Sequence, residues 1–155
     1  TQPKETLREL FGRICFNVLC GNTDDHARNH AAYWDGKMLT LSPAYDICPQ
    51  GRTGNEATQA MLIKGDNRMS TLASCIAAAS DFLLTDEEAV DIITQQIFTI
   101  AGEWDAVCTL ANLSATDKIL FGGRQFLNPY CIEGLSSVHN ALSRLFEESR
   151  GQLLG

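Results

Sequence analysis

The 155-residue sequence lacks any apolar run near the roughly 20 residues that a membrane-spanning helix needs, so it predicts no such segment. It also lacks the charged, then apolar, then small-residue opening of a secretory leader. Basic residues are few, with 12 Lys and Arg against 19 Asp and Glu, and the formal net charge is −7. Because Lys and Arg drive binding to nucleic-acid phosphates, we expect neither a nucleic acid nor a membrane as a direct partner.

The six cysteines include no CxxC pair, the spacing typical of zinc and redox sites. Cys15 and Cys75 lie among apolar residues, as buried free thiols usually do. We therefore expect reduced thiols and a cytoplasmic protein. No repeat, low-complexity tract or charge block divides the chain, and its length suits a single domain over residues 1–155.

The clearest positive signal is helical periodicity. Apolar residues at helical spacing predict a first helix from Pro3 to about Cys20, and Gly21 ends that pattern. A second helix is expected from Ser70, whose hydroxyl can cap it, to about Ser80.

Two further helices are expected in the second half of the chain. Thr85 and Glu88 form a capping box, in which each side chain satisfies a free backbone donor. The long helix that follows carries the apolar residues Val90, Ile93, Ile97, Ala101, Trp104 and Cys108. We predict that Ile93, Ile97 and Trp104 are core residues and line no cofactor pocket. The last helix is marked by Val138, Leu142, Leu145 and Phe146.

A short hairpin is expected between the first two helices. Asp35-Gly36 separates the apolar runs 31–34 and 37–41, and such a pair favours a type I′ turn with positive φ at both central residues. Ala60–Ile63 is a candidate for another short strand. The predicted fold is mainly α, of the α+β kind, with one small β-hairpin.

The chemically rich segment is the polar loop 21–30. Asp24 precedes Asn29 by five positions, the spacing of the D-x-x-x-x-N catalytic loop of kinases. A carboxylate can accept the proton of an attacking hydroxyl, and an amide oxygen nearby can hold Mg²⁺ against phosphates. Asp46 follows Asp24 by 22 residues, after the hairpin, and supplies the metal-binding carboxylate that this chemistry needs besides the Asn.

Other interpretations of these residues remain open. Acidic loops often serve only as caps and turns, and Asp25 is expected to be exposed or structural rather than catalytic. His26 and His30, four residues apart, invite a zinc hypothesis, but the segment is not helical and has no evident third ligand.

With these motifs the sequence resembles the HipA-like serine/threonine kinase family. The resemblance is carried by Phe16-Asn17-Val18-Leu19, Gly21-Asn22-Thr23-Asp24-Asp25-His26-Ala27-Arg28-Asn29 and Leu41-Ser42-Pro43-Ala44-Tyr45-Asp46. It is sharp over about residues 7 to 48 and weaker in the helical remainder. It implies a protein-kinase-like fold in which this chain is the α-rich C-terminal lobe.

The resemblance also implies residue roles. Asp24 is expected to be the catalytic base, with Asn29 and Asp46 as ligands of Mg²⁺ and the contacts of ATP. His26 lies where many protein kinases place a lysine that steadies the transferred phosphate, and Arg28 is a further candidate for phosphate charge. The nearby Tyr45 is expected to orient Asp46, with a direct nucleotide contact as the alternative.

The sequence departs from ordinary protein kinases at several points. Asn22-Thr23 stands where His-Arg would precede the catalytic Asp, and Ile47-Cys48 replaces Phe-Gly after Asp46. No Ala-Pro-Glu follows. A phosphate-covering loop and a strand lysine are not found, so we expect the N-terminal ATP-grasping lobe to lie outside this chain and the chain alone to be inactive.

Three hypotheses of function follow. The first is an ATP-dependent protein kinase of the toxin–antitoxin type, whose partners would be a protein substrate and a HipB-like DNA-binding antitoxin by family analogy. The second is a small-molecule or lipid kinase-like phosphotransferase. The third is a non-catalytic protein-binding module.

Overall fold

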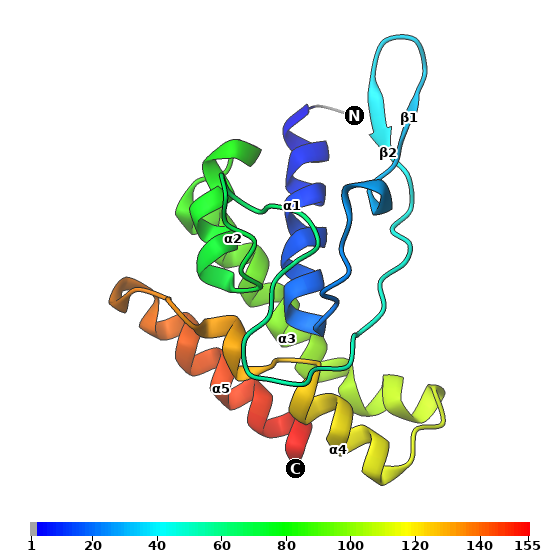
Figure 1. Ribbon diagram of the computed structural model, residues 1–155, viewed down its shortest axis with the longest axis vertical. Helices are drawn as coiled ribbons and strands as arrows, with labels where there is room; N and C mark the ends of the chain where they lie inside the picture. Colours follow the sequence, from blue (N-terminus) through cyan, green and yellow to red (C-terminus); the bar gives the residue numbers. More distant parts are fainter. Residues whose placement is uncertain (1–2) are drawn as a thin grey trace.

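The computed structural model describes residues 3–155, which form helices around a central α1 and one projecting hairpin (Figure 1). The α-helices are α1 (Pro3–Cys20), α2 (Leu72–Ala78), α3 (Asp86–Leu110), α4 (Ala115–Arg124) and α5 (Asn140–Leu154), and the strands are β1 (Ala32–Trp34) and β2 (Leu39–Leu41). Short 3₁₀ turns lie at Ala27–Asn29, Ala79–Phe82, Pro129–Ile132 and Ser137–His139. The mainly α class with one hairpin is confirmed. Within the described part of the chain, no helix combines the length and apolarity needed to cross a membrane.

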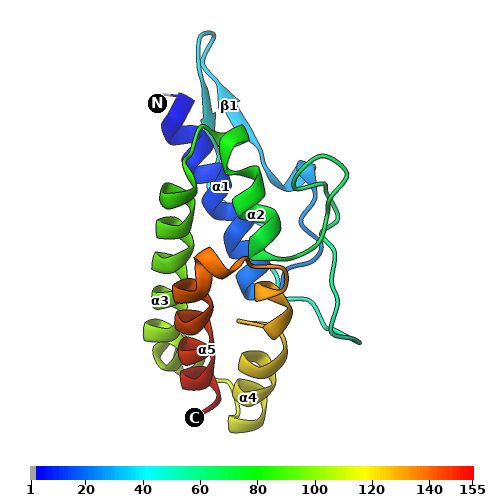
Figure 2. The same ribbon diagram turned by 90° about the vertical axis from the view of Figure 1, so that its left-hand side faces the viewer.

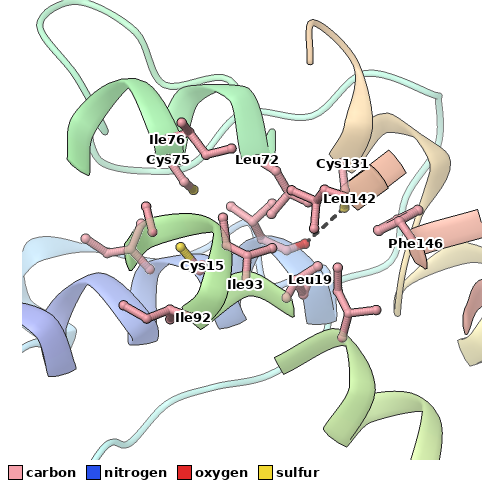
Figure 3. Close-up of a cluster of buried hydrophobic side chains, with 14 of the residues drawn as sticks. Cys15, Leu19, Leu72, Cys75, Ile76, Ile92, Ile93, Cys131, Leu142 and Phe146 are labelled. Atoms are coloured by element: carbon pink, nitrogen blue, oxygen red, sulfur yellow. Dashed lines mark hydrogen bonds between the residues drawn. The ribbon is translucent and has the colours of Figure 1, made fainter. Parts of the chain in front are cut away.

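The core lies where α1 packs against α2 and α3, and where α5 packs against α3 and α4 (Figure 2). Figure 3 shows Leu19 of α1, Leu72 of α2, Ile93 of α3 and Phe146 of α5 meeting in this core, and all four side chains are almost completely buried. The predicted core residues Ile93, Ile97 and Trp104 are confirmed as buried.

None of the six cysteines forms a disulfide, and all except Cys48 are buried. Figure 3 shows the sulfur atoms of Cys15 and Cys75 lying between α1 and α2. Burial raises the pKa of the Cys131 thiol to about 12 and that of Cys15 well above its ordinary value. These thiols therefore stay protonated near neutral pH and act as small core side chains.

The capping signals located the helices well. The Thr85–Glu88 capping box is confirmed, with Glu88 N donating to Thr85 Oγ1 at 3.1 Å and Thr85 N donating to Glu88 Oε2 at 2.9 Å. The prediction that Ser70 caps the second helix was wrong, because the N-cap of α2 is Thr71. Ser70 is instead buried and accepts a hydrogen bond from Gln59.

The last helix begins later than its apolar pattern indicated. Val138 precedes α5 in a 3₁₀ turn and is 83% exposed, so it is not part of the buried stripe. α4, which the apolar pattern did not reveal, packs against α5 and carries Gly122 and Gly123 in its last turn.

The hairpin exists, but its turn differs from the predicted one. β1 pairs with β2 in the register Ala32↔Leu41, Tyr33↔Thr40 and Trp34↔Leu39, which leaves the four-residue connection 35–38. Only Gly36 in that connection has a positive φ, of 97°, so the type I′ prediction was wrong. The Asp35 carboxylate accepts hydrogen bonds from Lys37 N and Met38 N, both at 2.8 Å, and these bonds lower the pKa of Asp35.

The predicted strand at Ala60–Ile63 was also wrong. The segment is a bend held by two isolated bridges, Thr58 to Met69 and Lys64 to Asn67. Ile63 is buried, and its N–H donates to the Asn67 carbonyl at 2.8 Å. The segment meets residues 67–69 only through these isolated bridges, so within the described residues it extends no sheet and instead anchors a loop against the core.

Candidate active site

The loop that carries the predicted site begins where α1 meets a distant part of the chain. Gly21 ends α1 with a φ of +74°, and a Cβ placed there would lie 2.7 Å from the Gln125 carbonyl oxygen. Next to it, Leu127 N donates to the Leu19 carbonyl at 2.8 Å. Glycine is therefore required at this position, and residues following α4 fix where the loop begins.

Asn22 connects the two predicted catalytic segments. Its side chain is 1% exposed, and its Nδ2 donates to Asn17 Oδ1 of α1 at 3.0 Å and to the Asp46 carbonyl oxygen at 3.4 Å. Its Oδ1 accepts the backbone N–H of Asp24 at 3.2 Å. One buried amide thus holds the main chain at Asp24 and at Asp46 to the end of the same helix.

The side chains of Asp24 and His26 face each other at the surface. His26 Nε2 lies 2.9 Å from Asp24 Oδ1, and the side chains are 32% and 61% exposed, respectively. The ring nitrogen of His26 is therefore directed at the predicted base. The Asp24 carboxylate remains mostly exposed to solvent.

The 3₁₀ turn Ala27–Asn29 places the Asn29 side chain against the main chain of Asp24. Asn29 is 6% exposed, and its Nδ2 donates to the Asp24 carbonyl oxygen at 3.4 Å. Among residues 3–155, no group donates to its Oδ1. This orientation commits the amide nitrogen to the loop and leaves the amide oxygen as a potential ligand.

Tyr45 and Asp46 bring the second segment against this turn. Tyr45 Oη donates to the Arg28 carbonyl oxygen at 2.6 Å, so the phenol connects the segment after the hairpin to the loop 21–30. Asp46 has a left-handed backbone with φ of 58° and an exposed side chain. Its carboxylate has no hydrogen-bond or ion-pair partner within the described residues. A strained, unpartnered carboxylate held by its neighbours is a feature typical of ligand-binding positions.

Asp25 has a structural position. Asp25 is 1% exposed, and its Oδ1 lies 2.8 Å from His30 Nε2, so the pair connects the middle of the loop to its last residue. Of the two alternatives expected for Asp25, exposed or structural, the structure agrees with the structural one. His26 and His30 each contact a different carboxylate, and residues 3–155 contain no group of three or more His, Cys, Asp or Glu side chains arranged to hold a metal. The structure thus offers no ligand set for zinc.

Cys20, at the end of α1, is also close to the loop. Burial raises the pKa of its thiol to about 11, and its Sγ donates to the Asn17 carbonyl at 3.7 Å. The thiol is therefore protonated near neutral pH and contributes neither a nucleophile nor a thiolate ligand.

A scan against protein-family models matches residues 1–104 to the HipA-like C-terminal domain, which covers more than half of the chain. The chain belongs to this family. The match includes the loop 21–30, the hairpin and Asp46, and it ends within α3, before α4 and α5. Searches of the curated proteins and of the solved structures found no significant match.

The HipA-like assignment raises the question whether these residues suit a magnesium ion. Magnesium favours a few hard oxygen ligands and retains several waters. Asn29 Oδ1 and the Asp46 carboxylate are such oxygens, and neither is engaged by another described residue. The donor set therefore fits magnesium, with one neutral and one anionic ligand.

Sequence reasoning missed the role of Asn22, which it treated only as a departure from the usual kinase pattern. The missing signal lay one helical turn earlier. Asn17 is a polar residue inside the apolar run Phe16–Leu19, and such a residue is buried only if another polar group meets it. That partner is the Asn22 side chain.

Proposed function

We propose that this chain is the catalytic C-terminal lobe of a HipA-like serine/threonine protein kinase, which transfers the γ-phosphate of ATP to a protein hydroxyl. The observation that carries the proposal is the attachment of Asp24 and Asp46 to the single buried side chain of Asn22. These bonds hold the main chain at Asp24 and at Asp46 in a fixed relation, which a scaffold protein does not need.

In the proposed reaction, the substrate hydroxyl oxygen attacks the γ-phosphorus of ATP and the bond to the β-phosphate oxygen breaks, which releases ADP. Asp24 accepts the hydroxyl proton as the new bond forms. His26 orients the Asp24 carboxylate from 2.9 Å, and the Arg28 guanidinium supplies positive charge for the phosphate oxygens. Magnesium held by Asn29 and Asp46 would neutralise charge on the phosphates.

Tyr45 is proposed to act mainly through position, because its hydroxyl is bonded to the Arg28 carbonyl. The nucleotide contact remains a secondary proposal for its ring, which is 45% exposed. Neither strand of the described residues carries a lysine that could pair with the α- and β-phosphates. We therefore expect little transfer from this chain alone.

The biological setting is proposed by analogy with the family. A toxin of a toxin–antitoxin pair would act in the cytoplasm on a protein substrate and would be held by a HipB-like DNA-binding antitoxin. The net charge of −7 favours protein contacts over direct binding of this chain to nucleic acid.

The test is phosphate transfer from labelled ATP by the protein at its natural length. Asp24→Asn is expected to lower magnesium-dependent incorporation about a hundredfold or more, the contribution typical of a positioned acid–base group. Asp46→Ala is expected to lower it to a similar degree, about a hundredfold, because it removes the anionic ligand of the magnesium that neutralises phosphate charge. Asp91→Asn is the matched control. Asp91 is an exposed carboxylate on α3, and its loss is expected to leave transfer unchanged.

Three results would count against the proposal. Absence of both nucleotide binding and transfer in the folded protein would favour a protein-binding module. Transfer to small hydroxyl compounds but not to proteins would favour a small-molecule kinase. Equal activity of Asp24→Asn and the unmodified protein would remove Asp24 from the mechanism.

A further inference from the structure

A second site lies away from the catalytic loop, in a cavity of about 610 Å³. It is formed by the segment 52–55, the residues around the end of α4 and the following turn, and Arg150 of α5. None of the predicted catalytic residues lines it. Its volume falls within the range of about 300–1,000 Å³ that is usual for small-molecule sites.

The charge of this cavity is opposite to that of the chain. Arg52, Arg124 and Arg150 line it together with one acidic residue, Glu133, whereas the whole chain has a formal net charge of −7. Within the described residues, none of the three arginines forms an ion pair with a carboxylate. A cluster of uncompensated guanidinium groups in a concave site attracts anions.

The arginine side chains also have unused hydrogen-bond donors. All three guanidinium nitrogens of Arg52 and the Nε of Arg150 are buried and have no partner among residues 3–155. The Arg52 guanidinium lies over the Tyr130 ring, 5.9 Å from its centroid, and burial lowers the pKa of Arg52. Buried charged donors without acceptors are costly, so an anion that enters the cavity would gain hydrogen bonds that the described residues do not supply.

We propose that this cavity binds the phosphate group of a phosphate monoester. The guanidinium fork matches phosphate and carboxylate oxygens alike, but three arginines exceed what one carboxylate of single charge requires. A phosphate monoester carries about −1.5 to −2 charges at pH 7 and offers three acceptor oxygens. The cavity also leaves room for the group that carries the phosphate.

The site is independent of the proposed kinase activity in its chemistry and in its residues. Most of its lining comes from the part of the chain beyond residue 104, where the family match ends. Arg52 also lines the cavity, but it lies inside the matched residues 1–104, six residues after Asp46.

The first experiment is calorimetric titration with inorganic phosphate at constant ionic strength. Saturable binding is expected, and Arg52→Met and Arg150→Met should each weaken it about tenfold or more, the usual loss for a charge-assisted hydrogen bond. Arg144→Met, an exposed position on the same helix as Arg150, and Asp46→Ala are expected to leave the affinity unchanged. No saturable binding, or equal affinity in Arg52→Met and Arg144→Met, would overturn the proposal.

A measurement on the unmodified protein covers the case in which a variant fails to fold. The Nε–Hε resonances of Arg52 and Arg150 should shift on addition of phosphate but not of chloride at the same ionic strength. If both resonances stay in place, the donors are satisfied by water and the site is not a phosphate site.

The carrier is identified by comparing a sugar phosphate with a phosphoserine peptide. The carrier that contacts Tyr130 and Asn55 is expected to bind more tightly than inorganic phosphate, because it fills more of the cavity. If neither the sugar phosphate nor the phosphoserine peptide binds, the proposal of a phosphate monoester is overturned. The cavity would then be a site for the free phosphate ion. In either outcome Asp24→Asn should have no effect on binding, which separates this test from that of the proposed kinase.

Discussion

The helical core and the loop that follows α1 are both buried at their centres, but they are held by different interactions. The core consists of apolar side chains such as Leu19, Ile93 and Phe146, each almost inaccessible to water. The centre of the loop consists of the polar side chains of Asn22 and Asp25, which are as deeply buried. The burial of apolar side chains stabilises a fold without requiring a particular orientation of the groups, whereas a hydrogen bond requires a defined orientation of its donor and acceptor. The core therefore supplies stability, and the loop supplies the orientation of the site.

The largest loss of stability is expected from a substitution in the apolar core. Phe146→Ala is expected to lower the free energy of unfolding by about 3–5 kcal/mol, the usual cost of removing a buried aromatic ring. Urea unfolding followed by circular dichroism measures the change. Phe98→Ala is the control, because Phe98 is 59% exposed, and its loss should cost less than about 1 kcal/mol. Similar losses at the two positions would contradict the assignment of the core.

The next largest effect is expected where the two regions meet. Gly21→Ala combines a positive φ with a Cβ placed 2.7 Å from Gln125 O. It should cost about 2–5 kcal/mol, from a left-handed penalty of about 1–2 and overpacking of about 1–3 kcal/mol. Gly51→Ala is the matched control, since no atom lies within 4 Å of a Cβ there. An equally small loss of stability at both glycines would show that the backbone at Gln125 can move to accommodate the added Cβ, and would contradict the prediction.

The hydrogen bonds of the loop are tested by a double-mutant cycle. Asn22→Ala should lower the free energy of unfolding by about 1–3 kcal/mol, because it leaves Asn17 Oδ1 buried without a partner. The double variant with Asn17→Ala should be more stable than the sum of the single changes predicts, by about 0.5–3 kcal/mol. Additive losses would mean that the two amides do not act together.

The smallest effect is expected at an exposed cap, distant from both regions. Thr85→Ala removes the hydroxyl that accepts Glu88 N and should cost about 1 kcal/mol. Thermal unfolding at neutral pH measures it. Ser80→Ala, an exposed hydroxyl outside the capping box, is the control and should change little.

The same cap has a defined pH dependence. The backbone hydrogen bond from Thr85, followed by the bond from Lys4, lowers the pKa of Glu88 below its ordinary value of 4.5. A lowered folded pKa means that the ionised carboxylate stabilises the protein above about pH 4.5, and that this contribution is lost as the pH falls through the folded value. The stability difference between the unmodified protein and Glu88→Gln should therefore shrink below pH 4.5. A difference that stays constant with pH would contradict this.

Local sequence signals predicted the features that depend on neighbours along the chain. The end of α1 follows from Gly21, and the beginning of α3 from the hydroxyl and carboxylate of Thr85 and Glu88, because both signals act within one helical turn. α4 was missed, since its apolar residues are few and Gly122 and Gly123 lie in its last turn. Glycine lowers intrinsic helix propensity, and this helix is held by packing against α5.

Features that depend on distant partners could not be predicted. Ala60–Ile63 has the composition of a strand, but a strand requires a neighbour that pairs along its length, and residues 67–69 meet this segment only through isolated bridges. In the site, the spacing of Asp24, Asn29 and Asp46 was visible in the sequence, whereas the bond from Asn22 to the Asp46 carbonyl spans 24 residues and was not. The roles of these site residues remain predictions for the transfer assay.

The attachment of the end of α1 to the later chain has a consequence for the order of folding. The Sγ of Cys131 donates to the Val18 carbonyl at 3.4 Å, across 113 residues of sequence (Figure 3). Contacts of such high sequence separation form late, because a large loop must close before they are made. On the ribosome, α1 and the loop 21–30 emerge long before their anchoring segment does. The loop can therefore reach its final geometry only after most of the chain has been synthesised.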